Sequence, residues 1–338
     1  MVKVTVIDIA KKAGVSQSTV SKVLNNYPTI SKETRTKVLD AIKELDFHPD
    51  LVARSLVSKK SKTIGLIVGD ISNPFFSETS KVVIKNAREQ EIDVIISDTD
   101  YRLENLESAL RNMVGRRVDG ILVASVDRRD TVTTDLARKG FPIVLFNRHT
   151  DDKGTPYVVL DNERGSWLAV DHLVNLGHKR IAYISGSLSF STFQQRFEGY
   201  KKALTDYDIQ IDHQIVYNGN ADDEEIRRFL KKTLSLKNRP TSLHAATDRI
   251  AMIVMDQLTE MGLSVPDDFS VVGFDDIDIA SNPHISLTTI SQNKREMSQL
   301  ALEKLLNIIN ENDDDYPYQI ILEPELIIRS TTKDIHVV

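Results

Sequence analysis

The sequence predicts an α/β protein: a body of two doubly wound parallel-sheet lobes, preceded by an all-α helix-turn-helix headpiece. Strands and helices alternate from residue 63 onward, which is typical of doubly wound sheets. Residues 5–25 have instead the pattern of two short helices joined by a glycine turn. Charge divides the chain at the same place. Residues 1–62 hold twelve Lys and Arg against six Asp and Glu, a net charge of +6, whereas the whole chain of 338 residues carries −6.

The first two helices are marked by local end signals. Thr5 suits a helix N-cap, with Asp8 three residues on as its capping-box partner. Gly14 ends the first helix, because glycine takes the left-handed conformation at little cost. Ser16 begins the second helix. The polar residues left exposed on that second helix have the length that reads base edges in a major groove; they are Gln17, Ser18, Ser21 and Lys22.

The helix–glycine–helix pattern alone is equally compatible with two packed helices of a small bundle. The basic charge of residues 1–62 favours contact with phosphates, and so favours a DNA-binding helix-turn-helix. A third helix is expected over residues 32–45, with an apolar stripe of Val38, Leu39, Ile42 and Leu45. The core of such a headpiece is very small, so we expect it to be marginally stable by itself.

Segment 49–57 has two interpretations. Pro49 is suited to a helix start, and Ala53 and Leu56 lie on one apolar face that no neighbouring element covers. Two copies of this helix could pack together and insert a leucine into the minor groove of DNA. The alternative is an ordinary interdomain linker with some helical bias, and the residues by themselves leave both open.

The body is predicted from continuous apolar runs, as expected of parallel strands covered on both faces. The predicted strands are 64–68, 93–96, 120–124, 143–146, 158–160, 181–184, 215–217, 243–246 and 270–274. About ten strands are many for one sheet and suit two. The predicted domains are 1–48 for the headpiece, 49–62 for a hinge helix and linker, 63–161 plus about 291–320 for an N-terminal lobe, and 162–290 plus about 321–338 for a C-terminal lobe.

Composition excludes several classes of site. The chain has no Cys, which excludes disulfides and thiolate chemistry. The eight His show no metal-ligand spacing, and no phosphate-binding, dinucleotide or nucleophile-elbow motif is present. We therefore expect no cofactor, no metal and no enzymatic activity. No apolar run approaches the ~20 residues that span a bilayer and the N-terminus has no apolar signal region, so we expect a cytoplasmic protein without membrane contact.

Ligand-binding residues are expected at the carboxyl ends of strands that face a cleft between the lobes. Four segments qualify: 70–76, 146–148, 191–196, and 247–248 together with 273–276. Phe75 and Phe76 suit a sugar or a flat ring, and we expect one of them in the pocket; the alternative is that they begin the core face of the next helix. Asn147 and Arg148 can bind hydroxyls or a carboxylate, with a surface salt bridge as the alternative.

The run from Val6 to Asn25 resembles the headpiece signature of the lactose/galactose repressor family of bacterial transcription regulators, and LVARSL at 51–56 resembles its hinge helix. The body resembles the periplasmic sugar-binding fold, so the resemblance covers essentially the whole chain. Position 22 is more often Arg in the family; Lys22 lacks the bidentate fork, so weaker guanine readout is expected. The expected DNA contacts are Thr5, Ser16, Gln17, Ser18, Ser21, Lys22, Asn25, Ala53 and Leu56, the last as the intercalating side chain.

The resemblance implies a ligand-responsive repressor that binds a near-palindromic operator as a dimer. Its effector is expected to be a small molecule, a sugar or sugar derivative, in the interlobe cleft. The resemblance assigns effector clamping to Arg196 of the R-x-x-G pattern and to Asp275, whereas Asp248 could instead orient the loop or cap the next helix. The expected effector contacts are Ser72, Phe75, Phe76, Asn147, Arg148, Phe190, Gln195, Arg196, Asp248 and Asp275.

Two further partners are disfavoured by the resemblance. Family members that use a phosphorylated carrier protein as corepressor have an Arg in the helix at 294–310, where this chain has Glu303. The C-terminal residues 332–338 show no heptads of a tetramerising tail, so a homodimer is expected. The sequence leaves open whether the effector releases or tightens DNA binding.

Two other functions are less well supported by the sequence. A transport receptor would need a signal sequence in place of the headpiece. An α/β enzyme with Asp275 or Asp248 as general base would need a nucleophile or cofactor motif, and none is present.

Overall fold

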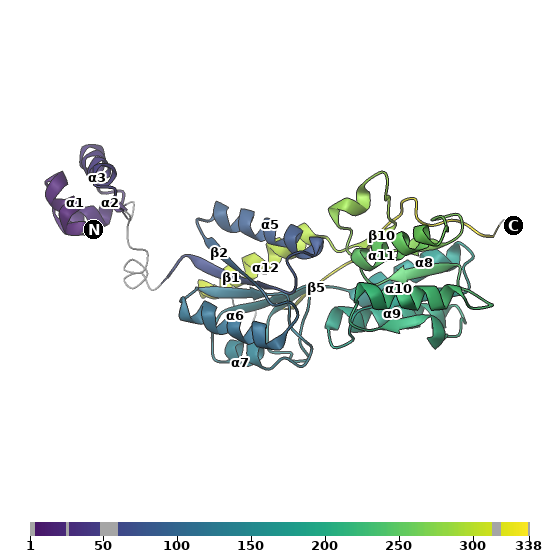
Figure 1. The fold of residues 1–338 in the computed structure, drawn as a ribbon. Helices are drawn as coiled ribbons and strands as arrows, with labels where there is room; N and C mark the ends of the chain where they lie inside the picture. Colours follow the sequence, from purple (N-terminus) through teal and green to yellow (C-terminus); the bar gives the residue numbers. More distant parts are fainter. Residues whose placement is uncertain (1–3, 25–26, 48–59, 313–318, 337–338) are drawn as a thin grey trace. The chain divides into compact units, whose positions relative to one another are not determined.

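The computed structural model describes residues 4–24, 27–47, 60–312 and 319–336 (Figure 1). The chain forms two compact units, Met1–Ser61 and Lys62–Val338. The first unit is called the headpiece below and the second the body, and each is described by itself. The expected hinge helix at 51–57 lies outside the described residues.

Three helices form the headpiece: α1 (Val6–Ala13), α2 (Gln17–Leu24) and α3 (Lys32–Glu44). The capping box that the sequence predicts before α1 is confirmed. The Thr5 hydroxyl oxygen accepts the backbone N–H of Asp8 at 3.4 Å, and the Asp8 carboxylate accepts that of Thr5 at 2.9 Å. Gly14 ends α1 with a left-handed φ of 67°. The helix–turn–helix arrangement is therefore built from its own local signals.

The headpiece core is small and is made by one side of each helix. Its buried side chains are Ile9, Ala10, Val20, Val23, Val38, Ala41 and Phe47. The prediction that Leu39 belongs to this core is wrong, because its side chain is 51% exposed. In α3 the buried positions are 38 and 41, and a helix with 3.6 residues per turn carries position 39 about 100° away from position 38.

The N-terminal lobe of the body is a six-stranded sheet in the order β11-β5-β4-β3-β1-β2, and every pairing in it is parallel. Its strands are β1 (Thr63–Val68), β2 (Asp93–Asp98), β3 (Gly120–Val123), β4 (Ile143–Phe146), β5 (Tyr157–Leu160) and β11 (Gln319–Leu322). Its helices are α5 (Pro74–Glu89), α6 (Leu103–Gly115), α7 (Val132–Arg138) and α12 (Lys294–Ile309). In Figure 1, α5 and α12 cover one face of the sheet and α6 and α7 the other. Both faces are thus buried, which explains the continuous apolar runs of β1, β3 and β4.

The C-terminal lobe is a four-stranded parallel sheet in the order β7-β6-β8-β9. Its strands are β6 (Ile181–Ser185), β7 (Val216–Asn218), β8 (Ser242–Ala245) and β9 (Ser270–Val272). Its helices are α8 (Asn162–Asn175), α9 (Ser191–Asp206), α10 (Asp223–Leu234) and α11 (Asp248–Glu260), with 3₁₀ turns at His213–Ile215 and Asp278–Ser281. α8 packs against α9, and α10 against α11.

The chain passes between the two sheets three times: between β5 and α8, between β10 (Thr289–Ser291) and α12, and between β11 and β12 (Glu325–Ile327). β10 and β12 pair with each other as a short antiparallel ribbon. These two strands and β11 are not among the predicted strands, because each has only three or four residues and none is a buried apolar run. The fold class is confirmed: an all-α headpiece and an α/β body of two parallel-sheet lobes.

Two negative findings apply to the described residues. No helix among them has the length and apolar character that crossing a membrane requires. Within the same residues, no group of three His, Cys, Asp or Glu side chains is placed to hold a metal ion.

Candidate functional site

The second headpiece helix presents a polar surface. Gln17, Ser18, Ser21 and Lys22 are exposed on α2, while Val20 and Val23 on the opposite side are buried. This division is the one that a recognition helix needs, because its apolar side must pack on the headpiece and its polar side must stay free.

Two of the expected DNA contacts also have structural roles. Thr5 is held in the capping box, and its hydroxyl donates to the Asp8 carboxylate at 2.7 Å. The Ser16 hydroxyl oxygen accepts the backbone N–H of Thr19 at 3.1 Å. Asn25, Ala53 and Leu56 lie outside the described residues.

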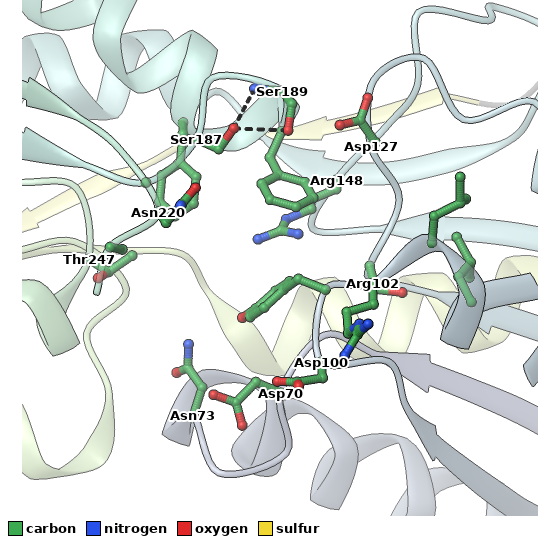
Figure 2. A pocket seen from close by; sticks show the side chains of 18 of the residues that line it. Asp70, Asn73, Asp100, Arg102, Asp127, Arg148, Ser187, Ser189, Asn220 and Thr247 are labelled. Carbon is green, nitrogen blue, oxygen red and sulfur yellow. Dashed lines mark hydrogen bonds between the residues drawn. The ribbon is translucent and has the colours of Figure 1, made fainter. Parts of the chain in front are cut away.

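The body contains a cavity of about 700 Å³ between its two lobes. In each lobe the strand order reverses once, between β1 and β3 in the first sheet and between β6 and β8 in the second. Ligands of doubly wound sheets bind outside the carboxyl ends of the strands at such switch points. The cavity walls come from there, with Ser125 after β3 and Phe190 after β6. Figure 2 labels three more wall residues at these strand ends: Asn73 after β1, Ser187 after β6 and Thr247 after β8.

Arg148 lies in the wall of this cavity and is only 4% exposed. Its guanidinium carbon lies 3.9 Å from the centre of the Phe190 ring, 5.0 Å from that of Tyr101 and 5.9 Å from that of Phe193. Tyr101 comes from the N-terminal lobe and the two phenylalanines from the C-terminal lobe, so Arg148 is enclosed by aromatic rings of both lobes. Burial lowers the pKa of Arg148 to about 10.

Beneath the main cavity, Arg196 and Asp275 form a buried ion pair with Nη1 3.2 Å from Oδ1. Arg196 also donates from Nε to the Asn162 amide oxygen at 2.8 Å and from Nη1 to the carbonyl of Ala246 at 2.6 Å. The Gln292 amide donates to the same Asp275 oxygen. These bonds join α8, α9, β8 and the loop after β9 into one network.

A small recess of about 30 Å³ extends the cavity toward this network, and Arg196, Asp275 and Gln292 line it. Two buried amide oxygens there, Asn147 Oδ1 and Gln292 Oε1, have no hydrogen-bond partner within the described protein. Buried polar atoms are rarely left unpaired. The recess therefore offers acceptors for hydroxyl or amino hydrogens of a ligand.

Asp248 is fully buried and turned away from the cavity. Its carboxylate accepts the backbone N–H of Ile277 at 2.9 Å and the hydroxyl of Thr289 at 2.5 Å. Burial, followed by the nearby Asp275 charge, raises the pKa of Asp248 to about 7. Burial likewise raises the pKa of Asp275, against the lowering influence of Arg196.

The residues expected to bind an effector fall into three groups. Arg148 and Phe190 line the main cavity, and Arg148 also lines the recess. The recess also has Phe75, Phe76, Asn147, Arg196 and Asp275 in its wall. Neither cavity is lined by Ser72, Gln195 or Asp248. The Ser72 hydroxyl donates a hydrogen bond to the Asp70 carboxylate at 2.6 Å. The side-chain amide of Gln195 is hydrogen-bonded to the side chains of Asn162 and His149. Both residues therefore stabilise the loops beside the cavity.

Sequence reasoning missed several wall residues, and Tyr101 is the most important of them. It follows β2, so the same carboxyl-end rule extended to the second strand would have found it. Phe193 lies one helical turn from Phe190 and belongs to a segment that was identified. Asn220 follows β7, the edge strand of the C-terminal sheet, for which no ligand segment was expected.

Comparisons with known proteins agree with this architecture in both units. Residues 5–50 match the bacterial regulatory proteins of the lacI family, and residues 170–332 match the periplasmic binding protein-like domain. The repressor PurR of Mannheimia succiniciproducens is 34% identical over 98% of this chain and 99% of its own length. The ribose operon repressor of Haemophilus influenzae is 33% identical over 97% of this chain and 98% of its own length.

A solved structure extends the similarity to the whole fold. The lac repressor dimer bound to operator and the anti-inducer ONPF matches 98% of this chain and 99% of its own, with a TM-score of 0.86 and 30% identity. The resemblance that the sequence showed is thereby confirmed. The chain belongs to the lacI family of bacterial regulatory proteins and is a ligand-responsive, DNA-binding transcription regulator.

Proposed function

We propose that this regulator is a cytoplasmic repressor that binds a near-palindromic operator as a homodimer and is controlled by a sugar or sugar derivative in the interlobe cavity. The headpiece supplies DNA readout and the body supplies the effector site. A two-fold dimer reads two equivalent half-sites, which is why the operator should be near-palindromic.

The DNA half of the proposal is supported by α2 and by charge. Gln17, Ser18, Ser21 and Lys22 form an exposed donor and acceptor surface on one helix. Residues 1–62 carry a net +6, which suits attraction to phosphates. The lac repressor dimer, a structural neighbour, is bound to operator DNA.

The effector half is carried by one observation: the buried Arg196–Asp275 pair borders a recess whose two amide oxygens have no partner. A charge pair held beside unpaired acceptors can bind a polyol through charge-assisted and neutral hydrogen bonds. The relatives include a ribose operon repressor, and one structural neighbour is a cellobiose complex.

The proposal is tested with DNA selected from a random duplex pool by the full-length protein. Band shifts over 50–200 mM salt should show affinity falling by roughly a thousandfold or more, as expected for several phosphate contacts. Lys22→Ala should weaken binding to the selected duplex about 5- to 150-fold, because it removes a base contact. Lys81→Ala, at an exposed position on α5, is the matched control and should leave binding unchanged.

Two results would refute the proposal that the headpiece binds a specific operator. The first is that the protein selects no duplex from the random pool. The second is that Lys22→Ala and Lys81→Ala change the affinity for DNA equally. Sedimentation of the complex measures the protein-to-DNA ratio, which should be two chains per duplex. The effector half is tested separately by adding candidate sugars to the band shift.

The alternative of an enzyme with Asp248 as general base lacks geometric support. Its carboxylate faces Ile277 and Thr289 inside the protein and does not line the cavity. A general base must reach the proton that it abstracts.

A further inference from the structure

A second pocket lies on the surface of the C-terminal lobe, where the start of α8 faces the end of α9. Its volume is about 350 Å³. Five of its six lining residues are charged, and the sixth is the only tryptophan of the chain. The six are Asp161, Glu163, Arg164, Trp167, Lys202 and Asp206. None of them lines the interlobe cavity or its recess, so this pocket is separate from the proposed effector site.

Arg164 is stacked on Trp167 in the wall of this pocket. Its guanidinium carbon lies 4.4 Å from the centre of the indole ring. Among the residues that the structure describes, no hydrogen bond or ion pair is found for the Arg164 guanidinium. A guanidinium held over an aromatic ring keeps its in-plane N–H groups available, and their fork matches the two oxygens of a carboxylate. Arg164 is therefore a preorganised donor for an anionic group.

Two carboxylates of the pocket each use one oxygen inside the protein. Asp161 Oδ1 accepts the backbone N–H of Arg164 at 2.8 Å, and Asp206 Oδ2 accepts the indole N–H of Trp167 at 2.7 Å. Within the described part of the chain, neither carboxylate has an ion pair, and the second oxygen of each has no hydrogen bond. By contrast, Lys202 and Glu163 form an ion pair at 3.2 Å and balance each other.

We propose that this pocket binds a free basic α-amino acid, whose carboxylate pairs with Arg164 and whose two cationic groups pair with Asp161 and Asp206. Apart from the balanced pair of Lys202 and Glu163, the walls offer one cation and two carboxylates. Lysine, ornithine and arginine carry the opposite set, one carboxylate and two cations. Such electrostatic complementarity selects among ligands of similar size.

Other ligand classes fit these walls less well. A dicarboxylate or a phosphate would bring like charge to Asp161 and Asp206, and a diamine without a carboxylate would bring like charge to Arg164. The indole of Trp167 also lines the pocket, which gives the methylene groups of a long side chain an apolar surface to contact. A basic amino acid uses both the charges and this surface.

The test titrates full-length protein with L-lysine, L-ornithine and L-arginine while Trp167 fluorescence is recorded. Because the chain has one tryptophan, a saturable change in its emission reports on this pocket, and calorimetry measures the dissociation constant. Norleucine lacks the side-chain ammonium of lysine, and cadaverine lacks its carboxylate. Each should bind about 3- to 10-fold more weakly than lysine, as expected when a partly exposed charged hydrogen bond is lost.

Two substitutions remove one wall charge each and keep the size of the side chain close to the original. Arg164→Gln should abolish the preference for lysine over cadaverine, because the partner of the ligand carboxylate is gone. Asp206→Asn should weaken lysine binding about 3- to 10-fold, while its amide oxygen still accepts the indole N–H. The controls are Arg88→Gln on α5 and Asp208→Asn after α9, both exposed and outside the pocket; they should keep the wild-type affinity.

Three outcomes would overturn the inference. Lysine binding that is unchanged in both pocket variants would place the ligand elsewhere on the protein. Equal affinities for lysine, norleucine and cadaverine would show that the wall charges do not select the ligand. Absence of binding by all three amino acids would show that the pocket is a hydrated surface groove. None of these results bears on the proposed function, which is tested with DNA and sugars.

Discussion

At the scale of single residues, the body is organised by buried charges whose partners decide their roles. Arg196 and Asp275 satisfy each other. The carboxylate of Asp248 accepts hydrogen bonds from a backbone N–H and from a hydroxyl, and no ion pair is found for it within the part of the chain that the structure describes. A buried carboxylate with neutral donors is easier to protonate than one paired with arginine. Asp248 is therefore a residue whose titration should be visible in the stability of the protein.

We predict that Asp248→Asn flattens the pH dependence of unfolding. Because the pKa of Asp248 is raised to about 7, the folded protein holds a proton that the unfolded chain releases above about pH 4. This residue therefore makes the free energy of unfolding fall as pH rises from about 4 to about 7. Asn does not titrate, so the variant should gain about 2–3 kcal/mol relative to wild type between pH 5 and pH 8.

Urea unfolding of both proteins at these two pH values measures the difference. Burial lowers the pKa of His244 to about 3 and that of His178 to about 4. These two histidines have the opposite influence, and it cancels because both proteins contain them. Identical pH slopes for wild type and variant would contradict the raised pKa of Asp248.

At the scale of elements, the packing of α8 on α9 positions the effector-side arginine. Arg196 and Gly199 lie one turn apart on α9, on the same side of the helix. A Cβ at Gly199 would stand 2.1 Å from the carbonyl oxygen of Glu163 on α8. Glycine at this place allows the two backbones to approach, and that approach brings Arg196 Nε to Asn162 at 2.8 Å.

Gly199→Ala should consequently destabilise the body by about 3 kcal/mol, because backbone must move to admit one methyl group. The same change at Gly115, at the end of α6, meets nothing within 4 Å. Gly115→Ala should be neutral or stabilise by up to about 1 kcal/mol. Chemical denaturation of the two variants checks the contrast, and equal stabilities would show that α8 and α9 do not depend on this close approach.

At the scale of the whole molecule, DNA readout and effector binding belong to different compact units. The basic residues 1–62 and the acidic remainder of the chain, with net charges of +6 and −12, fit this division of labour. Coupling between two sites requires that effector and DNA prefer the same or opposite global states. We predict that this coupling depends on the residues that connect the units.

Inserting six Gly and Ser residues after Lys60 should therefore reduce coupling while leaving effector affinity unchanged. In the unaltered protein the effector should change operator affinity about 5- to 150-fold, and the insertion should bring this ratio toward one. The same insertion after Lys237, an exposed position between α10 and β8, is the control and should preserve the ratio. Band shifts with and without effector measure it; full coupling in the Lys60 insertion variant would exclude the connecting residues as its route.

Local sequence is sufficient to predict the features that depend on a few neighbouring residues. The capping box of Thr5 and Asp8, the left-handed Gly14 and the polar side of α2 are set by local backbone geometry. The apolar runs of β1, β3 and β4 predicted a sheet covered on both faces. The carboxyl-end rule also located Arg148 and Phe190, because parallel strands end at the same edge of a sheet.

Which of these residues contact one another, and which have hydrogen-bond partners, depends on how the whole chain folds. Tyr101 and Phe190 enclose Arg148 from two lobes, and Asp248 turns inward to Thr289, contacts that join residues 41 or more positions apart in the chain. Such contacts depend on strand order and crossover paths, which no local pattern records. Burial and hydrogen bonding, which place Arg196 in a network with Asn162, Ala246 and Asp275, are properties of the packed molecule.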